Sequence, residues 1–218
     1  MTDVTDRELG RVRLRFLDLI KSFFINEPDA ERMSRWRGIV SALAGDVINP
    51  VFDQAVQRLG KMLEEKTLKE IQEEYYHLFI DPTSEDQVNT VMSYYVDGRS
   101  FGPSLVDYRN FLQRAGIVKD ESIKEPEDSL VLMLDTLATL IELQTKKECD
   151  TTLYQATLLH RFLDPLCQGF TRALQATGKA PFYTACGDFL RGYMILEKGL
   201  MDERGILGEP GEGDRKKE

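Results

Sequence analysis

Glu73 and His77 lie one helical turn apart, and side chains at that spacing can share a metal ion. The remaining histidine, His160, is distant, and no second Glu-x-x-His sequence completes a carboxylate-bridged site. A solvated pair on a helix surface is the simpler interpretation. The sequence therefore predicts no metal site.

Nucleophilic and phosphate chemistry find equally little support. Cys149, Cys167 and Cys186 are odd in number and widely spaced, without a C-x-x-C pair, which indicates a reducing compartment. Cys167 and Cys186 fall in apolar helical patterns, where cysteine is usually a small core residue. The sequence contains no G-x-S-x-G, G-x-x-x-x-G-K-[ST] or G-x-G-x-x-G motif. We expect no catalysis and no cofactor.

A short acidic segment is more informative. Lys124-Glu125-Pro126-Glu127-Asp128 predicts a helix that begins at the proline, with acids around its first turn. Carboxylates there stabilise the helix dipole by about 0.3–1 kcal/mol each, which is the simpler interpretation. The functional alternative is an anionic patch that receives arginine, because a carboxylate accepts two parallel hydrogen bonds from a guanidinium.

Aromatic residues concentrate just before this segment and around two predicted loops. Core packing explains many of them, but tyrosines beside loops also suit a peptide groove, so both interpretations stay open. The set comprises Tyr75, Tyr76, Phe79, Tyr94, Tyr95, Phe101, Tyr108 and Phe111.

Helical periodicity dominates the chain, and alternation of period two is nearly absent. Apolar residues recur at three- and four-residue steps over 7–24 and 129–145. We expect an all-α fold: one globular helical bundle, or two helical subdomains joined by a hinge. The expected parts are 1–116, a hinge at 117–125, 126–203, and a disordered tail at 204–218, which is rich in glycine and charge.

Composition narrows the class of protein. The formal net charge of −9 argues against binding to nucleic acid, which needs a basic face. The start of the chain is polar and acidic, unlike a secretory signal, and no apolar run approaches the roughly 20 residues of a membrane span. We expect a cytoplasmic protein without an integral membrane segment.

The order of several motifs resembles the TorD/DmsD family of redox-enzyme maturation chaperones, over roughly residues 7–200. The matching elements are Tyr75-Tyr76-His77-Leu78-Phe79-Ile80-Asp81-Pro82, Ser93-Tyr94-Tyr95, Phe101-Gly102 and Glu125-Pro126-Glu127-Asp128-Ser129. Two positions depart from the family pattern: Ser129 replaces a histidine and Asp81 replaces a glycine. These departures bear on ligand affinity and on the shape of the loop after Phe79.

The resemblance implies a chaperone that binds the twin-arginine signal peptide of a molybdenum-cofactor oxidoreductase. It would hold the catalytic subunit until the cofactor is inserted. Separately, the predicted hinge would permit a domain-swapped dimer as well as a monomer. The implied peptide-binding residues are Tyr76, Phe79, Ser93, Tyr94, Tyr95, Phe101, Gly102, Glu125, Pro126, Glu127 and Asp128. Gly102 would let the peptide backbone approach closely.

Three alternatives remain at this point. The first is a nitrate-reductase-type assembly chaperone, which acts on a reductase subunit that is not exported. The second is a small helical protein that binds or hydrolyses a nucleotide. The third is a helical adaptor with no defined peptide site.

Overall fold

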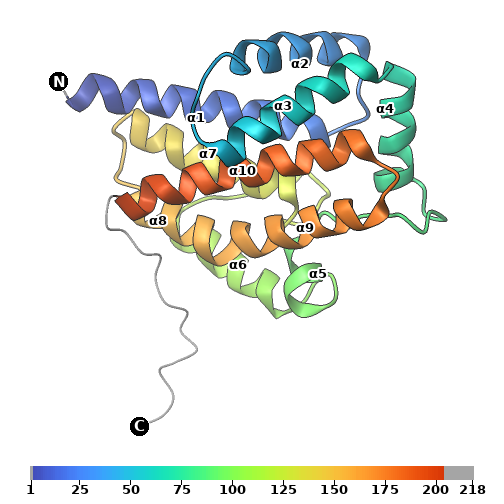
Figure 1. Cartoon of the computed structure of the whole chain (residues 1–218). Coiled ribbons are helices and arrows are strands. Elements are labelled where there is room, and N and C mark those ends of the chain that lie inside the picture. The colour runs from blue at the N-terminus through green and yellow to red at the C-terminus, as the bar shows by residue number, and fades with distance from the viewer. Residues whose placement is uncertain (1, 204–218) are drawn as a thin grey trace.

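The computed structural model describes residues 2–203, with side chains from 6 to 202. These residues form helices and loops without a β-sheet, which confirms the all-α prediction (Figure 1). The α-helices are α1 (Thr2–Phe24), α2 (Ala30–Leu43), α3 (Pro50–Glu65), α4 (Leu68–Tyr75), α5 (Met92–Asp97), α6 (Pro103–Arg114), α7 (Leu130–Thr145), α8 (Thr152–Thr157), α9 (Asp164–Thr177) and α10 (Pro181–Glu203). Two π-helical turns, Tyr76–Ile80 and Leu158–Leu163, continue α4 and join α8 to α9.

Local sequence signals set several helix boundaries. Asn49 accepts hydrogen bonds from the first backbone N–H groups of α3, and Pro50 occupies a position that needs no N–H donor. Thr67 and Glu70 form a capping box at α4, each bonding the other's backbone N–H. At the end of α9, Gly178 adopts φ of +64°, a conformation that glycine allows without strain.

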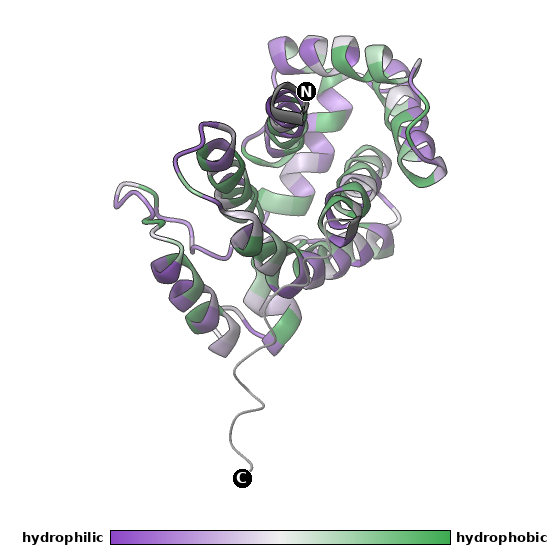
Figure 2. Ribbon diagram, turned by 90° about the vertical axis from the view of Figure 1, so that its left-hand side faces the viewer, coloured by the Kyte–Doolittle hydropathy of each residue, from purple (hydrophilic) through white to green (hydrophobic). Residues whose placement is uncertain are grey.

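Helix α10 lies at the centre of the bundle. It packs between α3 and α9 and also contacts α1, while α1 lies along α7 (Figure 1). Hydrophobic residues mark the sides of the helices that face one another, and hydrophilic residues mark the outer sides (Figure 2). Buried residues from both halves of the chain, including Phe23, Phe52, Leu137 and Phe189, belong to one hydrophobic core. The segment 117–125 is a loop between α6 and α7, and its role as a hinge stays a prediction.

A buried polar network ties α1 to the C-terminal helices. The Arg13 guanidinium donates three hydrogen bonds to the Glu197 carboxylate, at 2.9, 3.1 and 2.7 Å, and one to Gln155 at 2.8 Å. Tyr193 donates to the same carboxylate at 2.5 Å. Since both charges are almost fully buried, each depends on the other for compensation.

Two expectations concern the end of the chain and the membrane. The predicted tail, 204–218, lies beyond the described residues. Within 2–203, none of the helices combines the length and the apolar character that crossing a bilayer requires.

Candidate functional site

The acidic segment forms a loop rather than the start of a helix. Helix α7 begins at Leu130, so the predicted helix start at Pro126 is wrong. The Ser129 N–H donates to the Pro126 carbonyl at 3.0 Å, which closes a turn. We call residues 125–129 the acid-proline loop.

Long-range backbone pairing holds this loop in place. Val91 and Ser129 form an isolated antiparallel bridge. The Met92 N–H donates to the Asp128 carbonyl at 2.9 Å, and the Leu130 N–H donates to the Thr90 carbonyl at 2.8 Å. Pairing with residues 90–92 therefore overrides the local preference of proline for a first helical turn. The carboxylates do not occupy a helical first turn, so the helix-dipole interpretation no longer accounts for them.

The three acids of the acid-proline loop point to different surroundings. Glu125 is exposed and lines a groove beside α1. Glu127 accepts a hydrogen bond from Arg109 of α6 at 2.8 Å, and this bond lowers the pKa of its carboxyl group. Asp128 is fully buried and accepts from the Ser93 backbone N–H at 2.8 Å. A single rim of three acids does not form.

Asp128 supports a strained aromatic residue through Ser93. The Ser93 hydroxyl accepts a hydrogen bond from the Phe101 backbone N–H at 3.1 Å. Phe101 has φ of +60°, an uncommon conformation for a bulky residue, and its side chain is 71% exposed. A residue in such a strained backbone conformation persists only where surrounding contacts hold it there, and such residues are often found at functional sites.

Gly102 packs closely against another residue of this chain, Asp97. A Cβ at this position would come within 2.2 Å of an Asp97 carboxylate oxygen. Asp97 itself accepts from the Ser104 N–H at 3.0 Å and from its hydroxyl at 2.6 Å, at the start of α6. Packing against Asp97 therefore explains this glycine without a peptide.

The predicted aromatic residues divide between core and surface. Phe79 is half-buried and packs against Phe24 and Phe170 in the core. Tyr95 is also half-buried, and its hydroxyl donates to the Asn89 carbonyl at 2.5 Å. By contrast, Tyr76 and Tyr94 are about half exposed. The sequence-based set therefore mixes residues that support the surface with residues that form it.

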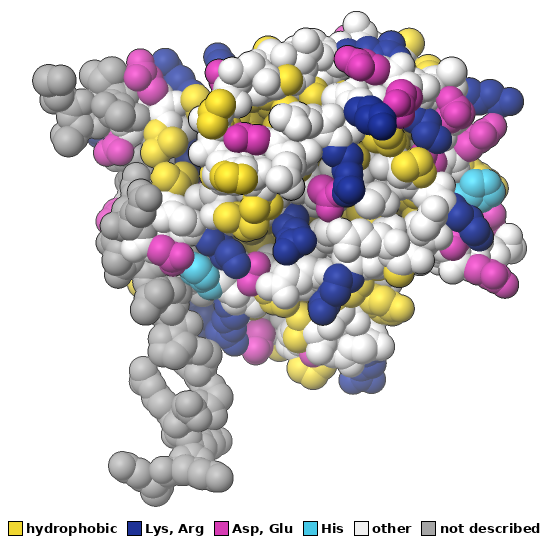
Figure 3. Space-filling model, viewed as in Figure 1, with side chains coloured by type: hydrophobic (Ala, Val, Ile, Leu, Met, Phe, Trp, Pro, Cys, Tyr) yellow, Lys and Arg dark blue, Asp and Glu magenta, His cyan; other side chains and the backbone are white. Residues whose placement is uncertain are grey.

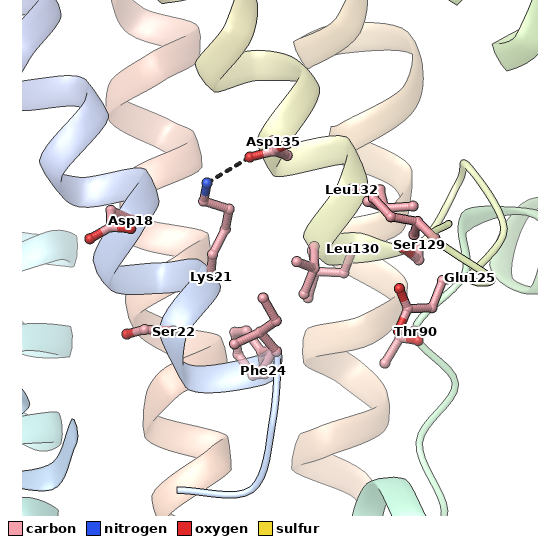
Figure 4. A pocket seen from close by; sticks show the side chains of 13 residues that line it. Asp18, Lys21, Ser22, Phe24, Thr90, Glu125, Ser129, Leu130, Leu132 and Asp135 are labelled. Carbon is pink, nitrogen blue, oxygen red and sulfur yellow. Dashed lines mark hydrogen bonds and ion pairs between the residues drawn. The ribbon is translucent and has the colours of Figure 1, made fainter. Parts of the chain in front are cut away.

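The groove beside Glu125 runs between the C-terminal half of α1 and the start of α7 (Figure 4). Its cavity volume is about 430 Å³. Its lining is mixed, with apolar side chains between polar ones. The apolar members are Phe24, Ile25, Ile123, Leu130, Val131 and Leu132, and the polar ones are Asp18, Lys21, Ser22, Thr90, Glu125, Ser129 and Asp135. We call this cavity the α1–α7 groove.

Charge in the α1–α7 groove is predominantly negative. Lys21 reaches across from α1 to Asp135 of α7 at 2.7 Å (Figure 4). Asp18 pairs with Arg35 of α2. Among the described residues, Glu125 has no ion-pair partner, so it offers a free carboxylate at the edge of an apolar surface.

Sequence reasoning missed the contribution of α1 to this groove. The apolar stripe over 7–24 predicts a core helix, and most of its apolar residues are indeed buried. Asp18, Lys21 and Ser22, in the last turns of that helix, are the local signal that this side of α1 also meets polar groups. Nothing in the local pattern says that α7 and Glu125 lie opposite.

Metal binding and nucleophilic catalysis by a thiol have less structural support than peptide binding. Among residues 2–203, no group of three or more His, Cys, Asp and Glu side chains could hold a metal ion. Burial raises the pKa values of the Cys167 and Cys186 thiols well above their ordinary value, which keeps both thiols protonated and poorly nucleophilic. His77 is a surface residue 3.7 Å from Asp81.

The described residues form an all-helical bundle with a groove of mixed apolar and polar lining, and comparison with known proteins gives the family. The model of the nitrate reductase delta subunit family matches residues 48–172, more than half of the chain. The chain therefore belongs to the nitrate reductase delta subunit family. The matched region contains the acid-proline loop but neither α1 nor α10. No curated protein matches the chain.

A solved structure has the same fold. It is a crystal structure from Archaeoglobus fulgidus of a protein described as a candidate redox enzyme maturation protein. The TM-score is 0.53 at 16% sequence identity, and the match covers 82% of this chain and 92% of that one. Together with the family match, this likeness confirms the resemblance to redox-enzyme maturation chaperones that the motifs indicate.

Proposed function

We propose that this protein is a cytoplasmic, non-enzymatic chaperone that binds the twin-arginine signal peptide of a molybdenum-cofactor oxidoreductase. In this role it holds the catalytic subunit until the cofactor is inserted and export can begin. The membership of the chain in a family of maturation chaperones supports the general role. The α1–α7 groove supports the choice of a peptide ligand.

The observation that carries this proposal is the free Glu125 carboxylate beside an apolar surface in the α1–α7 groove. A twin-arginine leader has two guanidinium groups followed by an apolar segment. Glu125 would accept one guanidinium through two parallel hydrogen bonds. Apolar residues of the leader would then cover Ile25, Ile123 and Val131, which keep exposed surface in the groove, in the manner of a helix or extended segment in a hydrophobic groove.

The remaining predicted site residues take supporting or peripheral roles in this proposal. Pro126, Ser93 and Asp128 hold the acid-proline loop and the turn at Phe101. The exposed rings of Tyr76, Tyr94 and Phe101 offer further contacts to the client protein beyond the groove. Phe79, Tyr95 and Gly102 shape the support beneath them, and Glu127 stays engaged with Arg109.

Calorimetric titration with a twin-arginine leader peptide tests the proposal. Replacement of both leader arginines by lysine removes the bidentate contact, and we expect roughly tenfold or greater weakening. Glu125→Gln should cause a comparable loss. Glu121→Gln is the matched control, since Glu121 is an exposed acid in the preceding loop that does not line the groove. Equal binding by all variants and both peptides would reject the assignment of Glu125.

The family match favours a second candidate function, because the matching model describes a nitrate reductase subunit. In this case the ligand is the N-terminal segment of a reductase subunit that is not exported and carries no twin-arginine motif. The same groove would bind it mainly through apolar contacts. Equal affinity for the arginine and lysine leaders, together with weaker binding after Ile25→Ala, would favour this candidate, since Ile25 is an exposed apolar residue of the groove.

We also propose that the chain is a monomer that can exchange its C-terminal helices through the 117–125 loop to form a dimer. The anchors that the structure records near this loop are mostly local. The Ile117 N–H donates to Leu112, and Lys119 donates to the Glu125 carbonyl at 2.7 Å. Size-exclusion chromatography with light scattering tests this: a deletion that shortens the loop should raise the dimer fraction, and an unchanged monomer would reject it.

A further inference from the structure

The second feature that suggests a ligand is a groove between α9 and α10, which the proposed function does not use. Its cavity volume is about 540 Å³. Basic side chains stand over these two helices on the face seen in Figure 3. The lining includes Thr171 and Arg172 from α9, and Arg191 and Lys198 from α10.

The alignment of the two helices places both arginines along one groove. Two side-chain pairs fix this alignment: Lys198 with Asp164 at 2.8 Å, and Gln175 with Asp188 at 3.1 Å. Since α9 and α10 are antiparallel, Arg191 lies between these pairs along the groove. Thr171 packs beside Gly187 of α10, one helical turn before Arg191. Two guanidinium groups from facing helices therefore flank one section of the groove.

These two guanidinium groups are not neutralised. Arg172 and Arg191 are exposed, and neither forms an ion pair with a carboxylate among the described residues. The one side-chain hydrogen bond of Arg172 goes to the Gln168 backbone carbonyl at 3.2 Å. The nearby Asp188 carboxylate is already shared by Arg58 and Gln175. This section of the groove is therefore cationic, in a chain whose net charge is −9.

Thr171 supplies an independent indication of a ligand. The residue lines the groove, is only 3% exposed, and its hydroxyl has no hydrogen-bond partner among the described residues. Buried hydroxyl groups are normally satisfied, and an unsatisfied one calls for a partner such as a bound oxygen atom. Thr171 lines the same groove as Arg172 and Arg191, one helical turn from Arg191, so an anion bound there would also meet both guanidinium groups.

We propose that the α9–α10 groove binds a small phosphate-bearing molecule. Guanidinium groups match phosphate oxygens through parallel hydrogen bonds, and the Thr171 hydroxyl donates to a further oxygen. A phosphate monoester carries about −1.5 to −2 charges at neutral pH, which two unpaired arginines balance. The acidic chain as a whole repels nucleic acid and anionic membranes, so a small molecule fits better than either.

Titration of the full chain at low ionic strength with glycerol 3-phosphate and with inorganic pyrophosphate tests this proposal. We expect saturable binding of both and none of glycerol. Arg172→Gln and Arg191→Gln should each weaken binding by roughly tenfold, the effect of losing one charge-assisted contact. Arg11→Gln removes the same charge from an exposed position on α1, and should leave the affinity unchanged.

Thr171→Val separates a built site from a general attraction between charges. Valine has the same shape and lacks the unsatisfied hydroxyl, so the thermal midpoint should stay equal or rise while phosphate binding weakens. Weakening of the same size in the Arg11 variant, or no saturable binding, would overturn the proposal. Tighter binding to phosphatidylglycerol vesicles or duplex DNA than to glycerol 3-phosphate would also overturn it. None of these outcomes depends on leader binding.

Discussion

Replacement of Asp128 by alanine should separate support of the binding surface from direct contact with a ligand. Asp128 is fully buried, and its Oδ2 accepts from the Ser93 N–H at 2.8 Å. Ser93 is also fully buried, so the alanine variant leaves that N–H without a partner. An unsatisfied buried donor costs about 1–3 kcal/mol. For a domain of this size, that loss lowers the thermal midpoint by about 2–12 °C.

The asparagine variant, Asp128→Asn, is the matched control. Its side-chain amide retains an oxygen that can accept from Ser93, but exchanges a charged hydrogen bond for a neutral one. The difference between the two kinds of bond is about 1 kcal/mol, so the stability of Asp128→Asn should lie between those of the wild type and Asp128→Ala. Thermal unfolding monitored by circular dichroism measures all three proteins.

Leader affinity, measured well below the unfolding transition, completes the comparison. Since Asp128 does not reach the surface, the alanine variant should bind the leader much more nearly like the wild type than Glu125→Gln does. The opposite pattern would refute this reasoning: an unchanged thermal midpoint with abolished leader binding would show that Asp128 meets the ligand directly.

Substitutions at four other positions test the fold. Arg13→Met strands the buried Glu197 carboxylate and should destabilise the protein by about 3–5 kcal/mol in urea unfolding, whereas replacing both partners by apolar residues should restore most of the loss. Gly169→Ala places a Cβ 2.5 Å from the Tyr95 ring and should lower the free energy of unfolding by about 1–3 kcal/mol. Gly60→Ala is the matched control: its Cβ meets no side-chain atom closer than 3.6 Å, so it should stabilise α3 by about 0.5–1 kcal/mol. Burial raises the pKa of Glu74, so the folded state binds more protons than the unfolded state. The free energy of unfolding should therefore fall as pH rises above about 4.5. Urea titrations at several pH values should show this fall in the wild type but not in Glu74→Gln.

The helices were predictable because their signals are local. Apolar residues at three- and four-residue steps predict α1 and α7, and Asn49-Pro50 supplies both the cap and the first residue of α3. The same local rule fails at Pro126, where backbone pairing with residues 90–92 prevails. A proline preceded by an acid cannot reveal a partner segment more than 30 residues away.

The candidate site was predictable only in part, because local sequence signals do not reveal contacts between segments that are distant in the chain. Glu125 could be nominated from the sequence because acids cluster around Pro126. The different surroundings of the three acids depend on contacts across the fold: Glu127 meets Arg109 from α6, and Asp128 meets Ser93 from α5. Lys21 likewise enters the site only because α1 lies along α7.

In the proposed function, the arrangement of the acid-proline loop would help the exposed Glu125 carboxylate to act as an anchor for the leader peptide. An arginine gains little from a mobile surface carboxylate, because the ion pair must overcome the entropy of ordering both side chains. Here the backbone that carries Glu125 is bonded to Lys119 on one side, and the turn at Asp128 is bonded to Met92 and Ser93 on the other. The cost of ordering that backbone is therefore met during folding rather than on binding. Because the other two acids are already engaged within the protein, Glu125 is the carboxylate of the loop that remains free for a ligand.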